Sequence, residues 1–186
     1  NLIWIKKQIE KFQHQARSTK RQYVSGETLF IWGKQYYLSF QPNSQKNGFE
    51  IKGDKVILSM REESTVKQRE NYVREQYRIL LKAEIERLLP KWERLTELYC
   101  DSWQTKYMLT RWGTCNTEKK KLWFNLQLAQ KPIECLEYVI LHELLHLKER
   151  THNSVFISCM DLYMKDWRAV RKELNDLRLD YYNKVE

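Results

Sequence analysis

The spacing of hydrophobic and polar positions changes twice along the chain, and each change predicts a different kind of element. Over residues 2–16, apolar side chains recur at helical spacing among Lys, Gln and Glu residues, which predicts an amphipathic helix. The next segment contains short runs rich in aromatic and β-branched residues. These runs predict strands at Thr28–Trp32, Gln35–Gln41, Phe49–Lys52 and Lys55–Met60, with a tight hairpin turn at Gly53-Asp54.

The pattern returns to a helical period over residues 63–99, where apolar side chains between Val66 and Leu88 lie on one face. Pro90 interrupts this pattern. Because proline lacks an N–H and clashes with the preceding turn, it predicts a break or a kink at this point. The apolar positions continue beyond it, so the segment does not resemble a flexible linker between domains.

Two strands and a helix are predicted next. Ser102–Trp112 and Lys121–Leu128 alternate apolar and polar residues, and the polar run Asn116–Lys120 between them suits a hairpin turn. Pro132 then occupies a favourable position in the first turn of a helix over residues 132–148.

The remaining chain completes the predicted fold. After a short loop, a helical pattern runs to near the C-terminus, and Asn153 or Ser154 is its N-cap. Together the segments predict an α+β fold in which helices pack on a small and mostly antiparallel sheet. No composition shift divides the chain, so residues 1–186 are interpreted as a single domain. The chain begins with Asn1 rather than Met, and we expect the N-terminal part of the full-length domain to be missing.

Composition and charge indicate a folded protein with a basic surface. Hydrophobic residues make up 42% of the chain and aromatic residues 13%, which is enough for a core although 31% of residues are charged. The net charge of +9 permits contact with nucleic acid or with an acidic protein surface. The lysines and arginines are spread along most of the chain, which is more typical of a general basic surface than of a dedicated nucleic-acid site.

The cysteines indicate neither a thiolate metal site nor a disulfide framework. They include no Cys-x-x-Cys pair and lie far apart, at Cys100, Cys115, Cys135 and Cys159. Since the sequence has no secretory signal, free thiols in a reducing cytoplasm are the better interpretation. The longest apolar stretches, such as Tyr138–Leu141, are far too short to cross a bilayer, and no membrane partner is expected.

The candidate chemistry lies in the segment His142-Glu143-Leu144-Leu145-His146. Two histidines four residues apart project from one face of a helix, about one turn from each other, so both imidazoles can reach one metal ion. A catalytic zinc site normally has three protein ligands. His152 is the third candidate, because a chain that turns after the helix can bring it back to the ion. Buried structural histidines rarely cluster in this way.

The ligand types favour one zinc ion over magnesium or calcium, while nickel, cobalt and manganese stay open. Glu143 is the predicted catalytic base, because it follows the first ligand and lies beside the metal rather than opposite it. It would take the proton of a water molecule that attacks a peptide carbonyl. Tyr163 and Arg111 are candidates for stabilising the oxyanion, although a core tyrosine and a surface arginine are the simpler interpretations. His14, on the polar side of the first predicted helix, is assigned no role.

Several ordered blocks of the sequence resemble the YgjP-like metallopeptidase family. The main blocks are Arg111–Cys115, Phe124–Leu128, Tyr138–Leu147 and His152–Phe156, and Tyr23–Glu27, Gly33–Leu38 and Trp167–Arg171 are similar to the family as well. The resemblance implies a zincin-type α+β fold in a cytoplasmic metalloprotease-like protein of bacteria or archaea. It also implies His142, His146 and His152 as ligands and Glu143 as the base. The spacing of the third histidine also resembles the SprT-like and WLM proteases, which act on DNA–protein crosslinks.

The leading hypothesis is a zinc-dependent peptidase that cleaves a protein or peptide substrate. Zinc peptidases with this motif commonly bind an extended peptide against a strand beside the metal helix, and the predicted hairpin within Trp103–Leu128 immediately precedes that helix. A metal-dependent nuclease is an alternative, since the histidine spacing also resembles an rRNA-maturation endoribonuclease family. That family does not show Glu beside the first ligand, which weighs against it. A metal-stabilised nucleic-acid- or protein-binding module is the third hypothesis, and a nucleic-acid-directed protease would combine it with the first.

Overall fold

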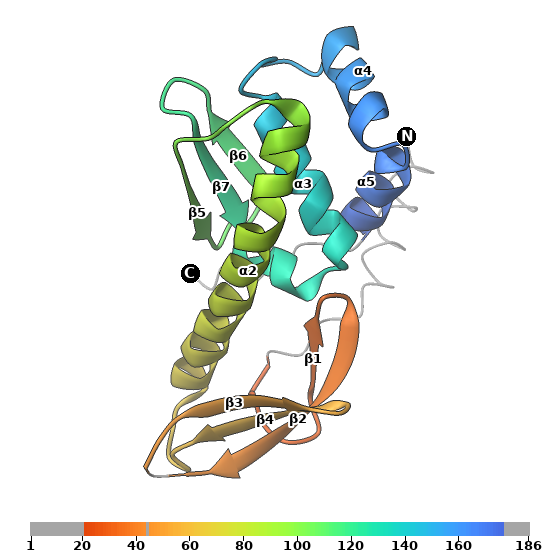
Figure 1. Cartoon of the computed structure of the whole chain (residues 1–186). Coiled ribbons are helices and arrows are strands. Elements are labelled where there is room, and N and C mark those ends of the chain that lie inside the picture. The colour runs from red at the N-terminus through yellow and green to blue at the C-terminus, as the bar shows by residue number, and fades with distance from the viewer. Residues whose placement is uncertain (1–20, 44, 177–186) are drawn as a thin grey trace, which may run out of the picture.

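Helix α2 (Val66–Thr96) runs along the length of the molecule and connects two small sheets (Figure 1). The computed structural model describes residues 21–43 and 45–176. One sheet lies at the beginning of α2, and the other lies beside its C-terminal half, next to helix α3 (Ile133–Leu145). The predicted α+β fold is confirmed. The helix predicted over residues 2–16 falls outside the described residues.

The N-terminal sheet has the strand order β1-β2-β4-β3. Strand β4 pairs parallel with β2 and antiparallel with β3, while β1 and β2 form an antiparallel hairpin. The tight turn predicted at Gly53-Asp54 is confirmed, because β3 and β4 pair directly across it. The strands are β1 (Thr28–Ile31), β2 (Lys34–Pro42), β3 (Gly48–Lys52) and β4 (Lys55–Met60).

The C-terminal sheet has the order β5-β7-β6, and it corrects the predicted hairpin. Strand β5 runs parallel to β7, whereas β6 is the antiparallel partner of β7. The predicted pairing of Ser102–Trp112 with Lys121–Leu128 in one hairpin is therefore wrong, although the turn before residue 121 is where it was expected. The strands are β5 (Ser102–Lys106), β6 (Gly113–Asn116) and β7 (Lys121–Asn125).

The buried side chain of Asn125 explains why the predicted strand over residues 102–112 is interrupted. Its Nδ2 donates hydrogen bonds to the carbonyl oxygens of Met108 (2.9 Å) and Arg111 (2.6 Å), and its Oδ1 accepts one from the Met108 N–H (3.3 Å). The side-chain amide of Gln127 also donates to the Met108 carbonyl at 2.9 Å. Because these side chains occupy backbone groups that a strand ladder would use, residues 107–112 form a loop.

Helix α2 begins at a complete capping box. The Thr65 side chain accepts a hydrogen bond from the Gln68 N–H (3.2 Å), and the Gln68 side chain accepts one from the Thr65 N–H (2.9 Å). The helix continues through Pro90, so of the predicted break or kink the break does not occur. Leu89 and Trp92 are buried on either side of the proline, and this packing stabilises the helix across it.

The elements after β7 are helical. A short 3-10 helix, η1 (Leu126–Gln130), replaces the end of the predicted strand and leads into α3. Pro132 is the N-cap residue of α3, one position before the helical turn in which it was expected. The predicted N-cap at Asn153 is confirmed, since its side chain accepts from the Phe156 N–H at 3.0 Å. Two helices follow rather than one continuous pattern, α4 (Ser154–Tyr163) and α5 (Trp167–Asp176).

The N-terminal sheet is joined to the rest of the molecule where the β1–β2 turn packs on η1. The Trp32 N–H donates to the Ala129 carbonyl (2.9 Å), and the Gly33 N–H donates to the Gln130 carbonyl (3.2 Å). Gly33 has φ +78°, and a Cβ at this position would lie 2.9 Å from Cγ of Pro132. Both the backbone angle and the close contact therefore require glycine.

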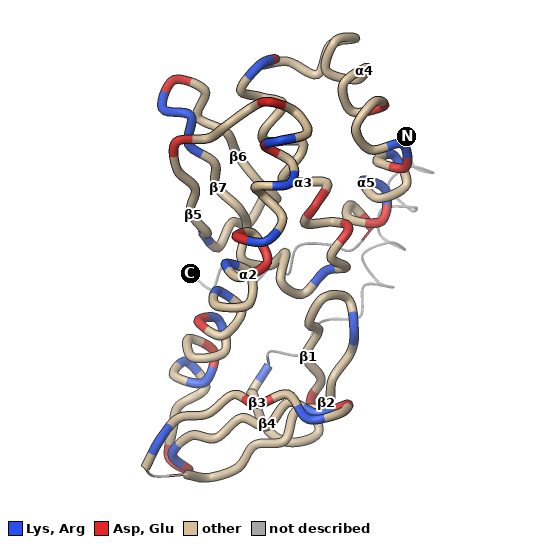
Figure 2. The backbone as a smooth tube through the Cα atoms, in the orientation of Figure 1, with Lys and Arg blue, Asp and Glu red and all other residues tan. Residues whose placement is uncertain are grey.

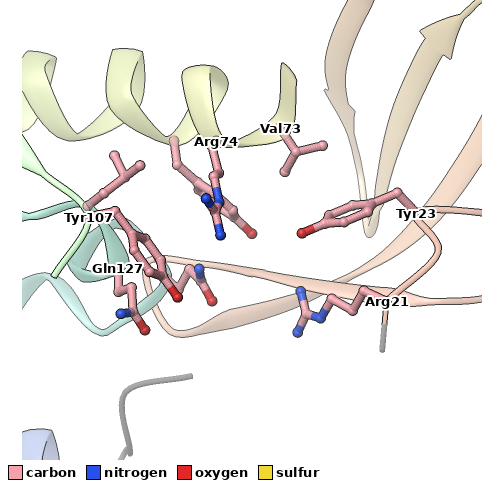
Figure 3. Close-up of a pocket in the computed structure, with 9 residues that line it drawn as sticks. Arg21, Tyr23, Val73, Arg74, Tyr107 and Gln127 are labelled. Carbon is pink, nitrogen blue, oxygen red and sulfur yellow. The ribbon is translucent and has the colours of Figure 1, made fainter. Parts of the chain in front are cut away.

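A second contact between the two parts surrounds a small cavity (Figure 3). The guanidinium carbon of Arg74 lies 4.3 Å from the centre of the Tyr107 ring, and Tyr23 of the N-terminal part lines the same cavity. The cavity volume is about 20 Å³. This volume holds about one water molecule and is too small for a substrate. The cavity is therefore part of the contact between the N-terminal sheet and the rest of the molecule.

The close contact between Gly33 and Pro132 predicts that alanine substitution lowers the free energy of unfolding more at Gly33 than at another glycine. Gly53→Ala is the matched control, because Gly53 has φ +60° but open space where a Cβ would lie. It should lose about 1 kcal/mol from the left-handed backbone alone. Gly33→Ala should lose at least about 1 kcal/mol more, because its Cβ also overlaps Pro132. Urea unfolding of the two variants tests this prediction, and equal losses would contradict this close contact.

Candidate metal centre

Helix α3 and the loop after it bring the three predicted histidines together. His142 and His146 lie one turn apart on α3, and His146 is the C-cap residue at which the helix ends. The chain then turns back, and His152 lies directly before Asn153, the N-cap residue of α4. The third histidine therefore reaches the other two because one helix ends and the next begins within a few residues.

The imidazole rings meet at their Nε2 atoms. Nε2 of His142 lies 3.2 Å from Nε2 of His146 and 3.0 Å from Nε2 of His152. One nitrogen from each ring lies within 4.8 Å of the other two. Phe156 packs against all three rings, with ring centres 4.8–5.0 Å apart. This aromatic contact holds the rings in place and excludes water from one side of the cluster.

The outer nitrogen of His146 determines which atom faces the cluster. Its Nδ1 lies 3.0 Å from the carbonyl oxygen of Glu149. Since a carbonyl only accepts, Nδ1 carries the proton, and Nε2 of the neutral ring directs a lone pair at the other histidines. Tetrahedral zinc, with Zn–N distances of about 2.0–2.1 Å, spaces its nitrogen ligands about 3.3 Å apart. The type, number and spacing of the donors therefore fit a zinc ion.

Tyr138 lies on the opposite side of His142, with its hydroxyl 3.5 Å from Nδ1. The Tyr138 ring stacks on Trp167 of α5, with ring centres 6.4 Å apart and an angle of 3° between the planes. Helix α5 thereby supports the orientation of a candidate ligand. Neither Tyr138 nor Phe156 was predicted from the sequence as part of the site. The position of Tyr138 four residues before His142 was the available signal for it.

Burial and like charges lower the pKa of two of the candidate ligands, His142 and His152. Burial, with smaller contributions from His146, His152 and Arg171, lowers the pKa of His142 to about 3. Burial also lowers the pKa of His152, and the charges of His146 and Arg171 act in the same direction. Because metals bind the neutral imidazole, protons compete little for these two rings at neutral pH.

Glu143 is buried between α3 and β6, where a glycine makes room for it. The residue is 5% exposed. A Cβ at Gly113 of β6 would lie 2.7 Å from Oε1 and 2.8 Å from Cγ of Glu143, so a larger residue would displace the carboxyl. Burial raises the pKa of Glu143 to about 8, and the positive charge of Arg111 acts in the opposite direction. Nothing in the local sequence pairs Gly113 with Glu143, because their contact spans two elements.

The other predicted residues lie in different environments. Arg111 is exposed in the loop directly before β6, and its charge reaches Glu143. Tyr163 is half-buried at the end of α4 and packs against the hydrophobic core, which is the simpler of its two interpretations. His14 falls outside the described residues.

The cysteines and the described helices have the properties that the sequence predicts for them. All four cysteines are free. Burial, with a contribution from the charge of Glu143, raises the pKa of the Cys115 thiol to about 11, so it is a poor metal ligand at neutral pH. Among residues 21–43 and 45–176, no helix is both long enough and apolar enough to span a bilayer.

The histidine cluster and the buried Glu143 raise the question of the class of protein, and comparison with known proteins answers it. The chain belongs to the YgjP-like metallopeptidase domain family, whose profile matches residues 1–177. The predicted family and the prediction of a metalloprotease are confirmed.

Two solved structures of metallopeptidase zymogens are similar to part of the chain. Jannalysin of Methanocaldococcus jannaschii has 19% sequence identity and a TM-score of 0.46, over 50% of this chain and 95% of its own. Abylysin of Pyrococcus abyssi has 17% identity and a TM-score of 0.45, over 50% of this chain and 96% of its own. The comparison with curated proteins gives no match.

The buried carboxyl predicts how the stability of the metal-free protein depends on pH. Glu143 ionises near its ordinary pKa of 4.5 in the unfolded chain but near 8 in the folded protein. Between these values the folded state holds a proton that the unfolded state has lost. The free energy of unfolding should therefore fall as pH rises, by on the order of 1 kcal/mol per pH unit from this group.

Glu143→Gln cannot ionise and should remove this contribution. In urea unfolding with a chelator, its stability relative to the unsubstituted protein should increase between about pH 5 and about pH 8. Glu134→Gln, an exposed position on the same helix, is the control and should show a constant difference. A constant difference for Glu143→Gln as well would contradict a buried, protonated carboxyl.

Proposed function

We propose that the protein is a zinc-dependent peptidase with one zinc ion bound by His142, His146 and His152 and with Glu143 as the catalytic base. The convergence of the histidine nitrogens carries this proposal, with 3.2 Å and 3.0 Å between the Nε2 atom of His142 and those of the other two. Three protein ligands leave a fourth position for water or substrate, as catalytic zinc requires. An all-imidazole set favours zinc over magnesium or calcium.

The position of Glu143 defines its role in the proposed reaction. A zinc ion held by the three histidines would supply polarisation of the substrate carbonyl and a lowered pKa of a water molecule, towards about 7. A cation beside the buried carboxyl also lowers the carboxyl's own pKa, so Glu143 is ionised and accepts the proton of the attacking water. The same carboxyl then donates this proton to the amine that leaves.

Arg111 and β6 supply the remaining parts of the proposed site. The positive charge of Arg111 acts on Glu143 through its electric field, and we propose that it also stabilises the negative charge that develops on the substrate oxygen. Strand β6 is at the edge of the C-terminal sheet as described, and its Gly113 lies against Glu143. A peptide that pairs with this edge as an extended strand would pass directly beside the proposed base.

Two further points concern the alternative chemistry and the cellular location. A metal-dependent nuclease stays the alternative chemistry, but Glu143 weighs against it, because the nuclease family with similar histidine spacing does not show Glu beside the first ligand. We also propose a cytoplasmic location, which the four free thiols support.

Substitution of the proposed base separates catalysis from metal binding. Glu143→Gln should keep its zinc but lower kcat/KM about 100- to 10,000-fold, because the general base is removed. Cleavage of fluorescein-labelled casein measures activity, and atomic absorption measures zinc content. Glu134→Gln on the same helix should retain full activity. Chelation of zinc should abolish the activity of the unsubstituted protein. Full activity of zinc-loaded Glu143→Gln would show that another group is the base.

Removal of the Tyr138 hydroxyl tests the support of His142. Tyr138→Phe should weaken zinc binding about 10-fold, because His142 loses the partner of its outer nitrogen while the ring still stacks on Trp167. Competition with a chromogenic chelator measures the affinity. Tyr163→Phe, in the core at the end of α4, is the control and should bind zinc normally. Unchanged affinity in Tyr138→Phe would mean that the hydroxyl does not orient His142.

A further inference from the structure

The face of the C-terminal sheet that points away from α3 carries a surface with no part in the proposed peptidase site. Leu122 and Phe124 of β7 are fully buried, whereas Trp123 between them is partly exposed. In the register of the sheet, Gln104 of β5 and Thr114 of β6 lie on either side of Trp123. We call this row, together with Lys121 in the next row, the outer face of the sheet.

Positive charge surrounds the Trp123 ring on the outer face. The Lys121 ammonium lies 4.6 Å from the ring centre. Lys119 and Lys120 are exposed in the β6–β7 turn, and Lys106 is exposed at the end of β5. Figure 2 shows basic residues at the β6–β7 turn and at the far end of β5. Residues 101–125 contain five Lys or Arg and two Asp or Glu, a net charge of +3 (5 − 2).

A groove along β5 extends the outer face towards α2. Its volume is about 370 Å³, and its lining residues are Arg78, Lys82 and Glu86 of α2 and Trp103, Gln104 and Thr105 of β5. Gln104 belongs both to this groove and to the row that contains Trp123. Arg78 is held in place by hydrogen bonds to the backbone oxygen and the hydroxyl of Thr105, both at 3.0 Å, and its charge is paired with Glu75, at 3.1 Å. Lys82 is exposed at the groove.

We propose that the outer face and this groove bind single-stranded nucleic acid, with a base stacked on Trp123 and phosphates at Lys121 and Lys82. Proteins that hold single strands without regard to sequence combine an aromatic stacking platform with a basic groove. A duplex fits poorly, because its bases already stack on one another. The net positive charge favours a polyanion over a neutral partner.

The two surfaces of the sheet can act at the same time. Gly113 of β6 faces Glu143 on α3, whereas its neighbour Thr114 belongs to the outer face. A bound nucleic acid would therefore leave the histidines open. It would hold the protein near other proteins on the same strand, whatever reaction the metal centre carries out.

Fluorescence anisotropy with fluorescein-labelled 12-nucleotide oligo-dT and oligo-U tests the proposal. Both should bind at low salt, more tightly than a 12-base-pair duplex. The logarithm of the association constant should fall with the logarithm of salt concentration, by about 0.7 for each phosphate contact. Trp123→Ala should weaken binding about 5- to 150-fold, whereas Trp123→Phe, which keeps a ring, should retain most of the affinity.

Matched variants separate this surface from general basic charge. Lys82→Gln should reduce the salt slope by about 0.7, and Lys165→Gln, an exposed lysine between α4 and α5, should not change it. Glu143→Gln and chelation should leave binding unchanged, so this proposal and the peptidase can fail independently. Circular dichroism and urea unfolding confirm that each variant is folded.

Three results would overturn the proposal. The first is equal binding by Trp123→Ala and the unsubstituted protein. The second is equal salt slopes for Lys82→Gln and Lys165→Gln. The third is tighter binding of the duplex, or binding of poly-glutamate with the same affinity and the same dependence on Trp123. The poly-glutamate result would assign the surface to an acidic protein segment instead.

Discussion

Three imidazoles whose nitrogen atoms converge on one point are the constraint on which the rest of the site depends. His142, His146 and His152 cannot all satisfy one another by hydrogen bonding, because each neutral ring has a single N–H and that of His146 is directed at the Glu149 carbonyl. A cation relieves this repulsion. The surrounding structure keeps the arrangement in place: Phe156 packs against all three rings, and Tyr138 contacts the outer side of His142. Such an ion would also tie α3 to the start of α4.

The proposed base depends on a different interaction, the close approach of β6 to α3. Glu143 occupies the space that any side chain at Gly113 would fill. Strand β6 reaches this position because Asn125 holds the preceding loop by hydrogen bonds to Met108 and Arg111. The same loop brings the charge of Arg111 near the carboxyl. One buried amide on β7 thus brings the edge strand and Arg111, which are neighbours in the sequence, to Glu143, which lies about 30 residues further on.

The C-terminal sheet can serve two purposes because its two faces differ in chemistry. Its inner face is apolar and packs on the helix that presents the histidines. Its outer face carries Trp123, lysines and polar residues, and continues into the groove beside α2. Alternation along a strand separates the two faces by a single residue, as Gly113 and Thr114 illustrate. A nucleic-acid surface and a peptidase centre could therefore occupy the same three strands without competing for space.

The sequence by itself determined the features that depend on neighbouring residues. Periodicity and turn chemistry predicted α3, the turn at Gly53-Asp54 and an N-cap at Asn153 or Ser154. The spacing within residues 142–152 predicted the metal-binding motif, and the resemblance of ordered blocks along the chain indicated the family. The tertiary structure decided what depends on distant contacts. It made β5 parallel to β7. It also ended β5 at Lys106, because Asn125 accepts a hydrogen bond from the Met108 N–H, 17 positions away. It kept α2 continuous at Pro90 through buried packing, and it placed Tyr138, Phe156 and Gly113 around the site. A local pattern records the conformation that each segment favours, but only the packed chain determines which segments meet.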